Sequence, residues 1–228
     1  MFPEELELER QHDEKSNRQR YSHVWEGAYE PQAVDAIWDR VTIHNNRRDV
    51  APEMGRIVVA VDPAGSTGPN SDLTGIVVVA RGDEDNHGYV LEDASMKGTP
   101  KQWAERVVAL HDRWEADAVV AERNYGGDLV EAVIKAVRPT VRYIAVNATR
   151  AKHVRAEPIS ALYTLGRVHH VGTFPELEDE MCQMTAHGYE GNGSPDRVDA
   201  AVWGLTELFP QMVQNKTRTV HVPNLGAG

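Results

Sequence analysis

The sequence predicts an α/β domain in which helices flank a mixed sheet of five strands, three antiparallel and then two parallel. Three antiparallel strands are expected at 55–62, 75–81 and 89–95, because these β-branched runs are joined by segments with no room for a crossover helix. Two further apolar runs, 117–122 and 141–146, alternate with helical patterns. Such alternation requires crossover connections, and therefore parallel neighbours in the sheet.

The helices expected beside this sheet have recognisable ends. Thr99 is the expected N-cap of the first, with Pro100 at its first helical position. Pro139 ends the second helix, because proline cannot continue a helical hydrogen-bond pattern. Further helices are expected at 33–43, 156–165, 174–184 and 195–209.

Length and composition fit one domain with extensions at both ends. No apolar run in the 228 residues approaches the roughly 20 residues of a membrane span, and the N-terminus lacks the basic and apolar regions of a signal peptide. The single cysteine, Cys182, excludes an internal disulfide and a Cys-rich zinc site, which fits a reducing compartment. We expect an N-terminal extension or linker (1–52), the α/β domain (53–212) and a flexible C-terminal tail (213–228).

Four carboxylates occupy positions from which a metal site can be built. Asp62 ends the first predicted strand and Glu122 ends the fourth. Asp196 and Asp199 lie three residues apart in the first turn of the last helix, so they share one helical face. Mg²⁺ and Mn²⁺ favour such oxygen ligands, and two ions roughly 3.5–4 Å apart can activate a water and stabilise a leaving oxygen. The set predicts in-line hydrolysis of a phosphodiester.

Each acid also has an ordinary structural explanation. Asp196 could cap its own helix, and Asp62 could accept N–H groups from the loop that follows it. Glu122 could pair with Arg123. Asp72, in the loop before the second strand, could be an auxiliary metal ligand, an acid behind the ligands or a turn residue. For each acid taken alone, the structural explanation is favoured. The order of all four acids along the chain favours the metal site.

The net charge of −11 ordinarily argues against a protein that binds nucleic acid. Acidic residues gather in the first 30 positions, however, and a metal-binding nuclease must itself carry uncompensated carboxylates. A local basic surface is therefore compatible with the acidic total. The best local candidates are Arg150, Lys152, His153 and Arg155, for which phosphate contact is favoured over a solvated face.

Four motifs follow one another along the chain: VDPAG at 61–65, SDLTGIVV at 71–78, VAERN at 120–124 and SPDRVDAAVW at 194–203. This ordered set resembles the C-terminal nuclease domain of tailed-phage large terminase subunits, which has an RNase H-like, RuvC-related fold. The resemblance covers roughly residues 56–209, and residues 21–28 resemble the linker that joins this domain to the terminase motor.

The resemblance implies an endonuclease that cuts concatemeric double-stranded DNA when genome packaging starts and ends, with two Mg²⁺ or Mn²⁺ ions. By motif match, Asp62 is the acid shared between both metals, Glu122 is a second ligand, and Asp199 or Asp196 is the remaining one. The implied partners are double-stranded DNA, the terminase ATPase motor, the small terminase subunit and the portal. They would be met in the cytoplasm of the host cell, without a membrane.

Two other functions remain open. One is a junction resolvase or RNase H that acts on branched or hybrid nucleic acid. The other is a catalytically inactive module of the same fold that docks on the portal or the motor. The ATP-binding motif Gly-x-x-x-x-Gly-Lys-Ser/Thr does not occur, so we expect this chain to cut DNA without pumping it, the motor being excised or encoded elsewhere.

Overall fold

The computed structural model describes residues 32–63, 73–123, 127–147 and 150–213, together with residues 7, 10 and 11. Asp72 lies outside the described residues. So do the predicted linker at 21–28 and all of the predicted tail except its first residue.

Within the described part of the chain, the main sheet has six strands in the order β5-β4-β1-β2-β3-β6. Its strands are β1 (Met54–Asp62), β2 (Gly75–Gly82), β3 (Gly88–Asp93), β4 (Ala118–Glu122), β5 (Tyr143–Val146) and β6 (Val168–His170). β1, β2 and β3 are antiparallel, whereas β4 runs parallel to β1 and β5 runs parallel to β4. The predicted fold class is therefore confirmed. The predicted count of five strands was wrong, because β6 adds a parallel partner to β3.

β6 was not predicted from the sequence, because it is three residues long and two of its residues are histidines, which give no strand signal. Both rings are nevertheless buried with hydrogen-bond partners. His170 Nδ1 donates to Glu178 (2.9 Å) and its Nε2 accepts from the Tyr163 hydroxyl (2.9 Å), while His169 Nδ1 donates to the Asn46 carbonyl (2.8 Å). Burial lowers the pKa of His170, so the neutral ring fits this pattern.

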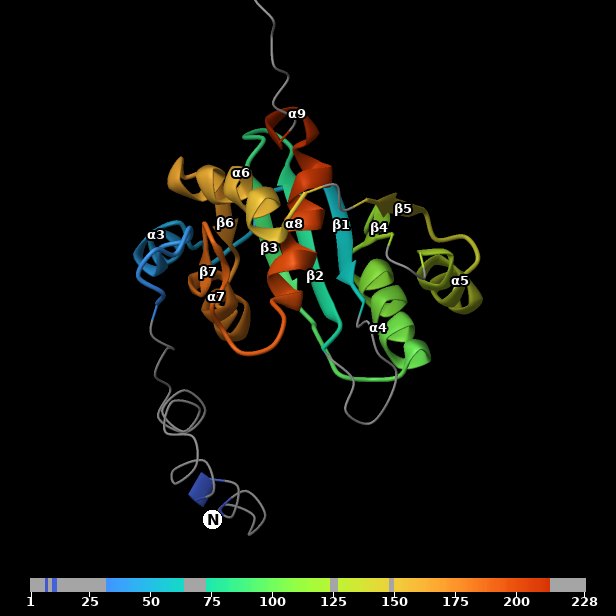
Figure 1. Cartoon of the computed structure of the whole chain (residues 1–228). Coiled ribbons are helices and arrows are strands. Elements are labelled where there is room, and N and C mark those ends of the chain that lie inside the picture. The colour runs from blue at the N-terminus through green and yellow to red at the C-terminus, as the bar shows by residue number, and fades with distance from the viewer. Residues whose placement is uncertain are drawn as a thin grey trace, which may run out of the picture.

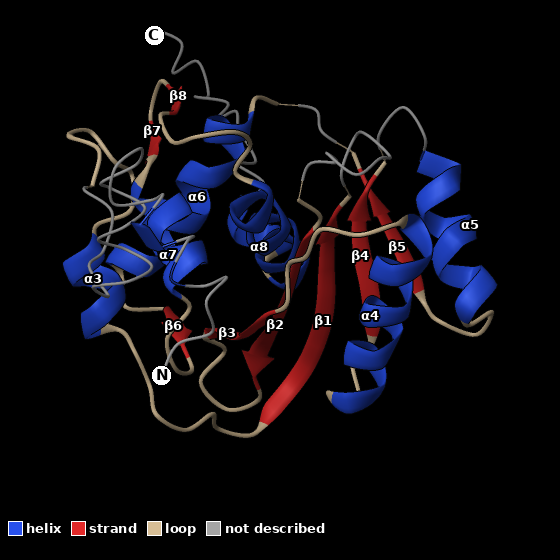
Figure 2. Cartoon of the chain, turned by 90° about the horizontal axis from the view of Figure 1, so that it is seen from below, coloured by secondary structure: helices blue, strands red, loops and turns tan. Residues whose placement is uncertain are grey.

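Helices cover both faces of the sheet. One face carries α3 (Arg40–Asn45), α6 (Lys152–Thr164), α7 (Pro175–Cys182) and α8 (Asp196–Leu208), and the other carries α4 (Pro100–Arg113) and α5 (Gly127–Val137), as Figures 1 and 2 show. The short α9 (Pro210–Val213) follows α8, and β7 (Met184–Thr185) pairs with β8 (Gly188–Tyr189). Among the described residues, no helix combines the length and apolar character needed to cross a membrane.

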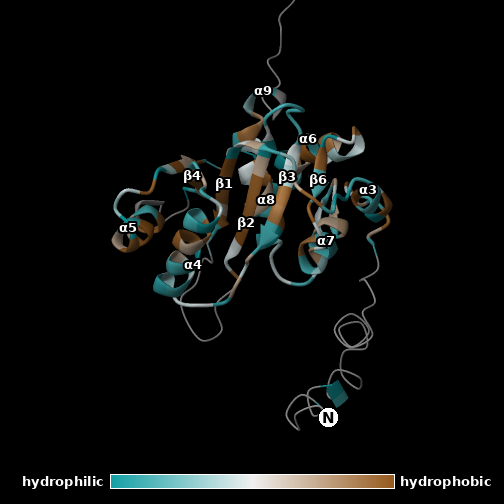
Figure 3. Cartoon of the chain, turned by 180° about the vertical axis from the view of Figure 1, so that it is seen from behind, coloured by the Kyte–Doolittle hydropathy of each residue, from teal (hydrophilic) through white to brown (hydrophobic). Residues whose placement is uncertain are grey.

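Alternation along the strands sends side chains into two cores. In β1, Val58 belongs to the core beneath α8, whereas Val59 and Val61 belong to the core beneath α4. Figure 3 shows hydrophobic residues running along the strands between the helical layers. Because the strands are covered on both faces, their sequences are continuous apolar runs instead of alternating ones.

Glycines let α8 lie directly on the sheet. A Cβ on Gly204 would be 2.5 Å from Val79 Cγ2 and 2.9 Å from Ala60 Cβ, both on buried strands. At the start of the helix, a Cβ on Gly75 of β2 would be 1.9 Å from the carbonyl oxygen of Asp196. These two close approaches fix how α8 lies across β1 and β2.

We predict that Gly204→Ala destabilises the protein. Overpacking costs about 1–3 kcal/mol, and the better helix propensity of alanine returns only about 1 kcal/mol of this. The expected net loss is about 1 kcal/mol in the free energy of unfolding, measured by urea denaturation. Gly98→Ala is the control, because its Cβ would meet the movable end of the Met96 side chain. Equal stability of the two variants would contradict tight packing at Gly204.

Candidate active site

Asp62 and Glu122 occupy equivalent positions at the ends of neighbouring parallel strands. The last register pair between β1 and β4 is Val61 with Ala121, and each strand continues with its acid. Since side chains alternate, Asp62 points to the same face of the sheet as Val58, the face that α8 covers. Asp62 is only 7% exposed. The sheet thus holds both carboxylates on rigid mounts at one edge.

The first turn of α8 brings the other two predicted acids to this edge. Asp196 contacts Gly75 through its backbone, and Gly75 is the register partner of Asp62 across β1 and β2. Asp196 and Asp199 are 8% and 3% exposed, so both are buried. The four acids named from the sequence therefore gather where β1, β4 and α8 meet, a corner that we call the acid corner.

The charges of these acids act on one another. Burial raises the pKa of Asp62 well above its ordinary value of 3.8, and the negative charges of Asp199, Asp196 and Glu122 raise it further, with Lys152 opposing them. Burial also raises the pKa of Glu122. Within the described residues, no hydrogen bond reaches the Asp62 carboxylate. Burial and the neighbouring acids together therefore disfavour the ionised form of Asp62.

Two cations from α6 lie against the acid corner. Lys152 Nζ forms an ion pair with Asp199, and Arg155 Nη2 donates a hydrogen bond to Asp199 Oδ1 (3.2 Å). Arg155 Nη1 is also 3.9 Å from Glu122 Oε2. Burial lowers the pKa of Lys152, but the nearby carboxylates outweigh burial and raise it above its ordinary value. Without any metal ion, the side chains of Lys152 and Arg155 therefore bring positive charge to the acid corner.

Arg155 is further held by an aromatic ring. Its guanidinium carbon lies 4.0 Å from the centre of the Trp203 ring of α8, a cation–π contact. Beside it is a cavity of about 350 Å³ whose walls include Arg150, Arg155 and Trp203. Arg150 is exposed and His153 is half-buried. Of the four predicted DNA-binding residues, Lys152 and Arg155 face the acids, and phosphate contact stays a prediction for all four.

The start of α8 is capped in a way that no sequence pattern reveals. Its N-cap residue, Pro195, supplies no side-chain cap. Instead, Glu180 of α7 accepts hydrogen bonds from the backbone N–H groups of Arg197 (3.0 Å) and Val198 (3.3 Å). The sequence suggested that Asp196 could cap this helix. The backbone N–H groups of Arg197 and Val198 are instead capped by Glu180, an acid from another helix.

The donor set of the acid corner suits a hard divalent cation, because it consists of carboxylate oxygens alone. The clustered negative charge around Asp62 fits such an ion as well. As the side chains stand in the described parts of the chain, no group of three or more histidines, cysteines or acids is arranged to hold a metal. Lys152 and Arg155 supply the positive charge there.

The fold places the protein in the RNase H-like class, with a mixed sheet between two helical layers. Residues 59–208 match the family model described as the terminase RNaseH-like domain, and the chain belongs to this family. The predicted resemblance to terminase nuclease domains is therefore confirmed. A comparison with curated proteins found no match.

Solved terminase nucleases share the fold. One is the large terminase nuclease from thermophilic phage G20c, with a TM-score of 0.53 at 16% identity over 76% of this chain and 99% of that chain. Its magnesium-bound structure gives 0.54 at 17% identity over 77% and 98%. A mutant nuclease domain of the large terminase subunit of bacterial virus Sf6, with manganese and beta-thujaplicinol, gives 0.55 at 14% identity over 78% and 98%.

The geometry predicts opposite effects of two conservative substitutions in metal-free buffer. Asp62→Asn should raise the melting temperature, because it removes a buried charge that repels its neighbours. Asp199→Asn should lower the melting temperature, because it removes the partner of Lys152 and Arg155. Each kcal/mol corresponds to about 2–4 °C for a chain of this size. Shifts of the same sign for both variants would contradict this arrangement.

The Asp62 effect should also depend on pH. A raised pKa means that stability is fully present below the ordinary value of 3.8 and is lost as the pH rises through the raised pKa. The stability advantage of Asp62→Asn over the wild type should therefore be absent near pH 4 and grow toward neutral pH. Urea denaturation at several pH values, with a chelator present, measures the difference.

Proposed function

We propose that the chain is the metal-dependent endonuclease domain of a phage DNA-packaging terminase large subunit. The observation that carries the proposal is the convergence of four carboxylates, three of them buried and Glu122 largely so, at one edge of an RNase H-like sheet. Family membership and the similarity to terminase nucleases, including one with bound magnesium, support it. The proposed substrate is concatemeric double-stranded DNA. The proposed partners are the ATPase motor, the small terminase subunit and the portal.

In this proposal the acids divide the work of holding two Mg²⁺ or Mn²⁺ ions. Asp62, between its acidic neighbours, is the shared ligand, with Glu122 and Asp199 or Asp196 as the others. When bound, the ions supply an activated water and stabilise the leaving oxygen of the phosphodiester. The strands and the first turn of α8 hold the carboxylates in place, so little reorganisation is needed. Asp72 stays a candidate auxiliary ligand.

Lys152 and Arg155 have two roles in the proposal. Without metal, they neutralise part of the negative charge of the acid corner. Two cations face four carboxylates there, so the carboxylates outnumber the cations. A divalent ion would compete with them for Asp199. Once released, both side chains lie beside the site where a phosphodiester must bind, with Arg150 and His153 next to them on the chain. This would give the predicted DNA contacts.

The competition can be measured directly. Lys152→Met should strengthen Mn²⁺ binding in calorimetry by about fivefold, which corresponds to about 1 kcal/mol. It should also weaken DNA binding and reduce the dependence of that binding on salt. The control is Lys135→Met in α5, whose partner is Glu131 on the other side of the sheet. Weaker Mn²⁺ binding by the Lys152 variant would argue against competition.

The nuclease assignment is tested with supercoiled plasmid and Mn²⁺ or Mg²⁺. Wild-type protein should nick and linearise the plasmid, and Asp62→Ala should leave it supercoiled. Glu105→Gln, at an exposed position of α4 away from the acid corner, should cut like the wild type. Supercoiled plasmid that persists with wild-type protein at all metal concentrations would refute the assignment. Four-way junctions or RNA–DNA hybrids that compete better than duplex DNA would favour a resolvase or RNase H.

One observation favours a different class, the inactive docking module. Asp199 and Glu122 are paired with Lys152 and Arg155, and the acids of the described residues form no ready metal-binding group. If the acids are vestigial, calorimetry should detect no Mn²⁺ binding that Asp62→Ala removes. Binding that depends on Asp62 would exclude this alternative.

A further inference from the structure

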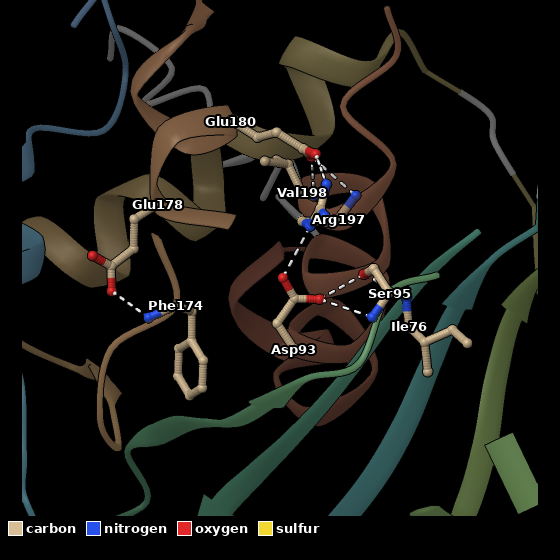
Figure 4. A network of polar contacts seen from close by, with 8 residues as sticks. All are labelled: Ile76, Asp93, Ser95, Phe174, Glu178, Glu180, Arg197 and Val198. Carbon is tan, nitrogen blue, oxygen red and sulfur yellow. Dashed lines mark hydrogen bonds and ion pairs between the residues drawn. The ribbon is translucent and has the colours of Figure 1, made fainter. Parts of the chain in front are cut away.

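A partly buried polar network links α7 to the first turn of α8 (Figure 4). Glu180 uses Oε2 to accept the backbone N–H groups of Arg197 and Val198, and Oε1 to accept Nη1 of the Arg197 side chain (2.8 Å). One carboxylate thus holds both the backbone and the side chain of the residue between Asp196 and Asp199. Side-chain exposure is 11% for Glu180 and 20% for Arg197, so water competes little for these bonds.

The network continues into the sheet. Arg197 Nε donates to Asp93 Oδ2 at the end of β3 (3.0 Å). Asp93 Oδ1 accepts from the backbone N–H (3.0 Å) and hydroxyl (2.6 Å) of Ser95, whose oxygen accepts the backbone N–H of Ile76 (3.0 Å). Ile76 follows Gly75, the residue that pairs with Asp62 and touches the start of α8. One chain of bonds therefore joins α7, α8, β3 and β2 beside the acid corner.

Charge makes each member dependent on the others. Burial raises the pKa of Glu180 to about 7, while Arg197 and the Val198 N–H favour its ionised form. Arg197 in turn has two carboxylate partners, Glu180 and Asp93. Removing Glu180 leaves the backbone N–H groups of Arg197 and Val198 without this acceptor, and removing Arg197 leaves Glu180 without its cation.

We propose that Glu180 and Arg197 are positioning residues for the metal-binding acids: they set the place of the first turn of α8, and through it the distance of Asp196 and Asp199 from Asp62. This inference rests on the proposed nuclease function. Neither residue contacts the substrate in this role. Their bonds hold Arg197 and Val198, whereas Lys152 and Arg155 pair with Asp199, so the two sets of contacts do not share a partner.

The test compares Glu180→Gln and Arg197→Lys with Glu176→Gln, an exposed control on the same helix α7. Mn²⁺ affinity is measured by calorimetry, and kcat and KM by plasmid cutting. We expect the two network variants to bind Mn²⁺ about tenfold more weakly, as do variants of residues that orient metal ligands. Their kcat should fall while KM for DNA stays unchanged, and Glu176→Gln should match the wild type.

A purely structural role gives a different result. In that case the variants would lose activity only because they unfold at a lower temperature than the wild type. Assays well below the melting temperature of each variant would then give wild-type Mn²⁺ affinity and kcat. That outcome would overturn the inference, as would wild-type values in both variants at every temperature. If either variant fails to fold, Asp93→Asn perturbs the far end of the network, and the same loss of Mn²⁺ affinity is expected there.

The experiment also separates this inference from the function on which it rests. Wild-type protein that neither binds Mn²⁺ nor cuts DNA would refute the nuclease and the inference together. Wild-type binding and cutting with unaffected network variants would refute the inference alone.

Discussion

Mutual repulsion among buried carboxylates is the constraint on which this structure depends. Asp62, Glu122, Asp196 and Asp199 gather at the end of two strands and one helix, and burial already disfavours the ionised forms of Asp62 and Glu122. The protein opposes this cost with cations from α6 and with a helix start fixed from outside the corner. Removing either would let the acids move apart, which lowers repulsion but destroys their convergence.

Close backbone packing makes that convergence possible. Gly75 and Gly204 allow α8 to lie where any larger residue would push it away from the sheet. The network through Glu180 then fixes the end of α8 that bears the acids, where packing alone would leave the first turn free to fray. Packing sets the height of the helix above the sheet, and hydrogen bonds set the position of its first turn.

The fold and the acid positions were predictable because local patterns encode them. Asp62 and Glu122 end β-branched runs, so their place at strand ends follows from the pattern, and the predicted three antiparallel and two parallel strands were confirmed, with β6 the one addition. His170 lies in a strand too short and polar to be read from sequence. The cap by Glu180 and the inward approach of Lys152 depend on contacts between distant segments, for which no spacing rule exists. Local sequence thus identified the acids but not the groups that hold them.

The contact between Arg155 and Trp203 gives the acid corner an optical property. The indole ring lies against a guanidinium that is itself held by Glu122 and Asp199, so the electronic surroundings of the ring follow the charge of the carboxylates. Any ligand that draws the guanidinium away changes the polarity beside one chromophore. The charge of the acid corner is therefore coupled, through one guanidinium, to the surroundings of a single indole ring among the five tryptophans of the chain.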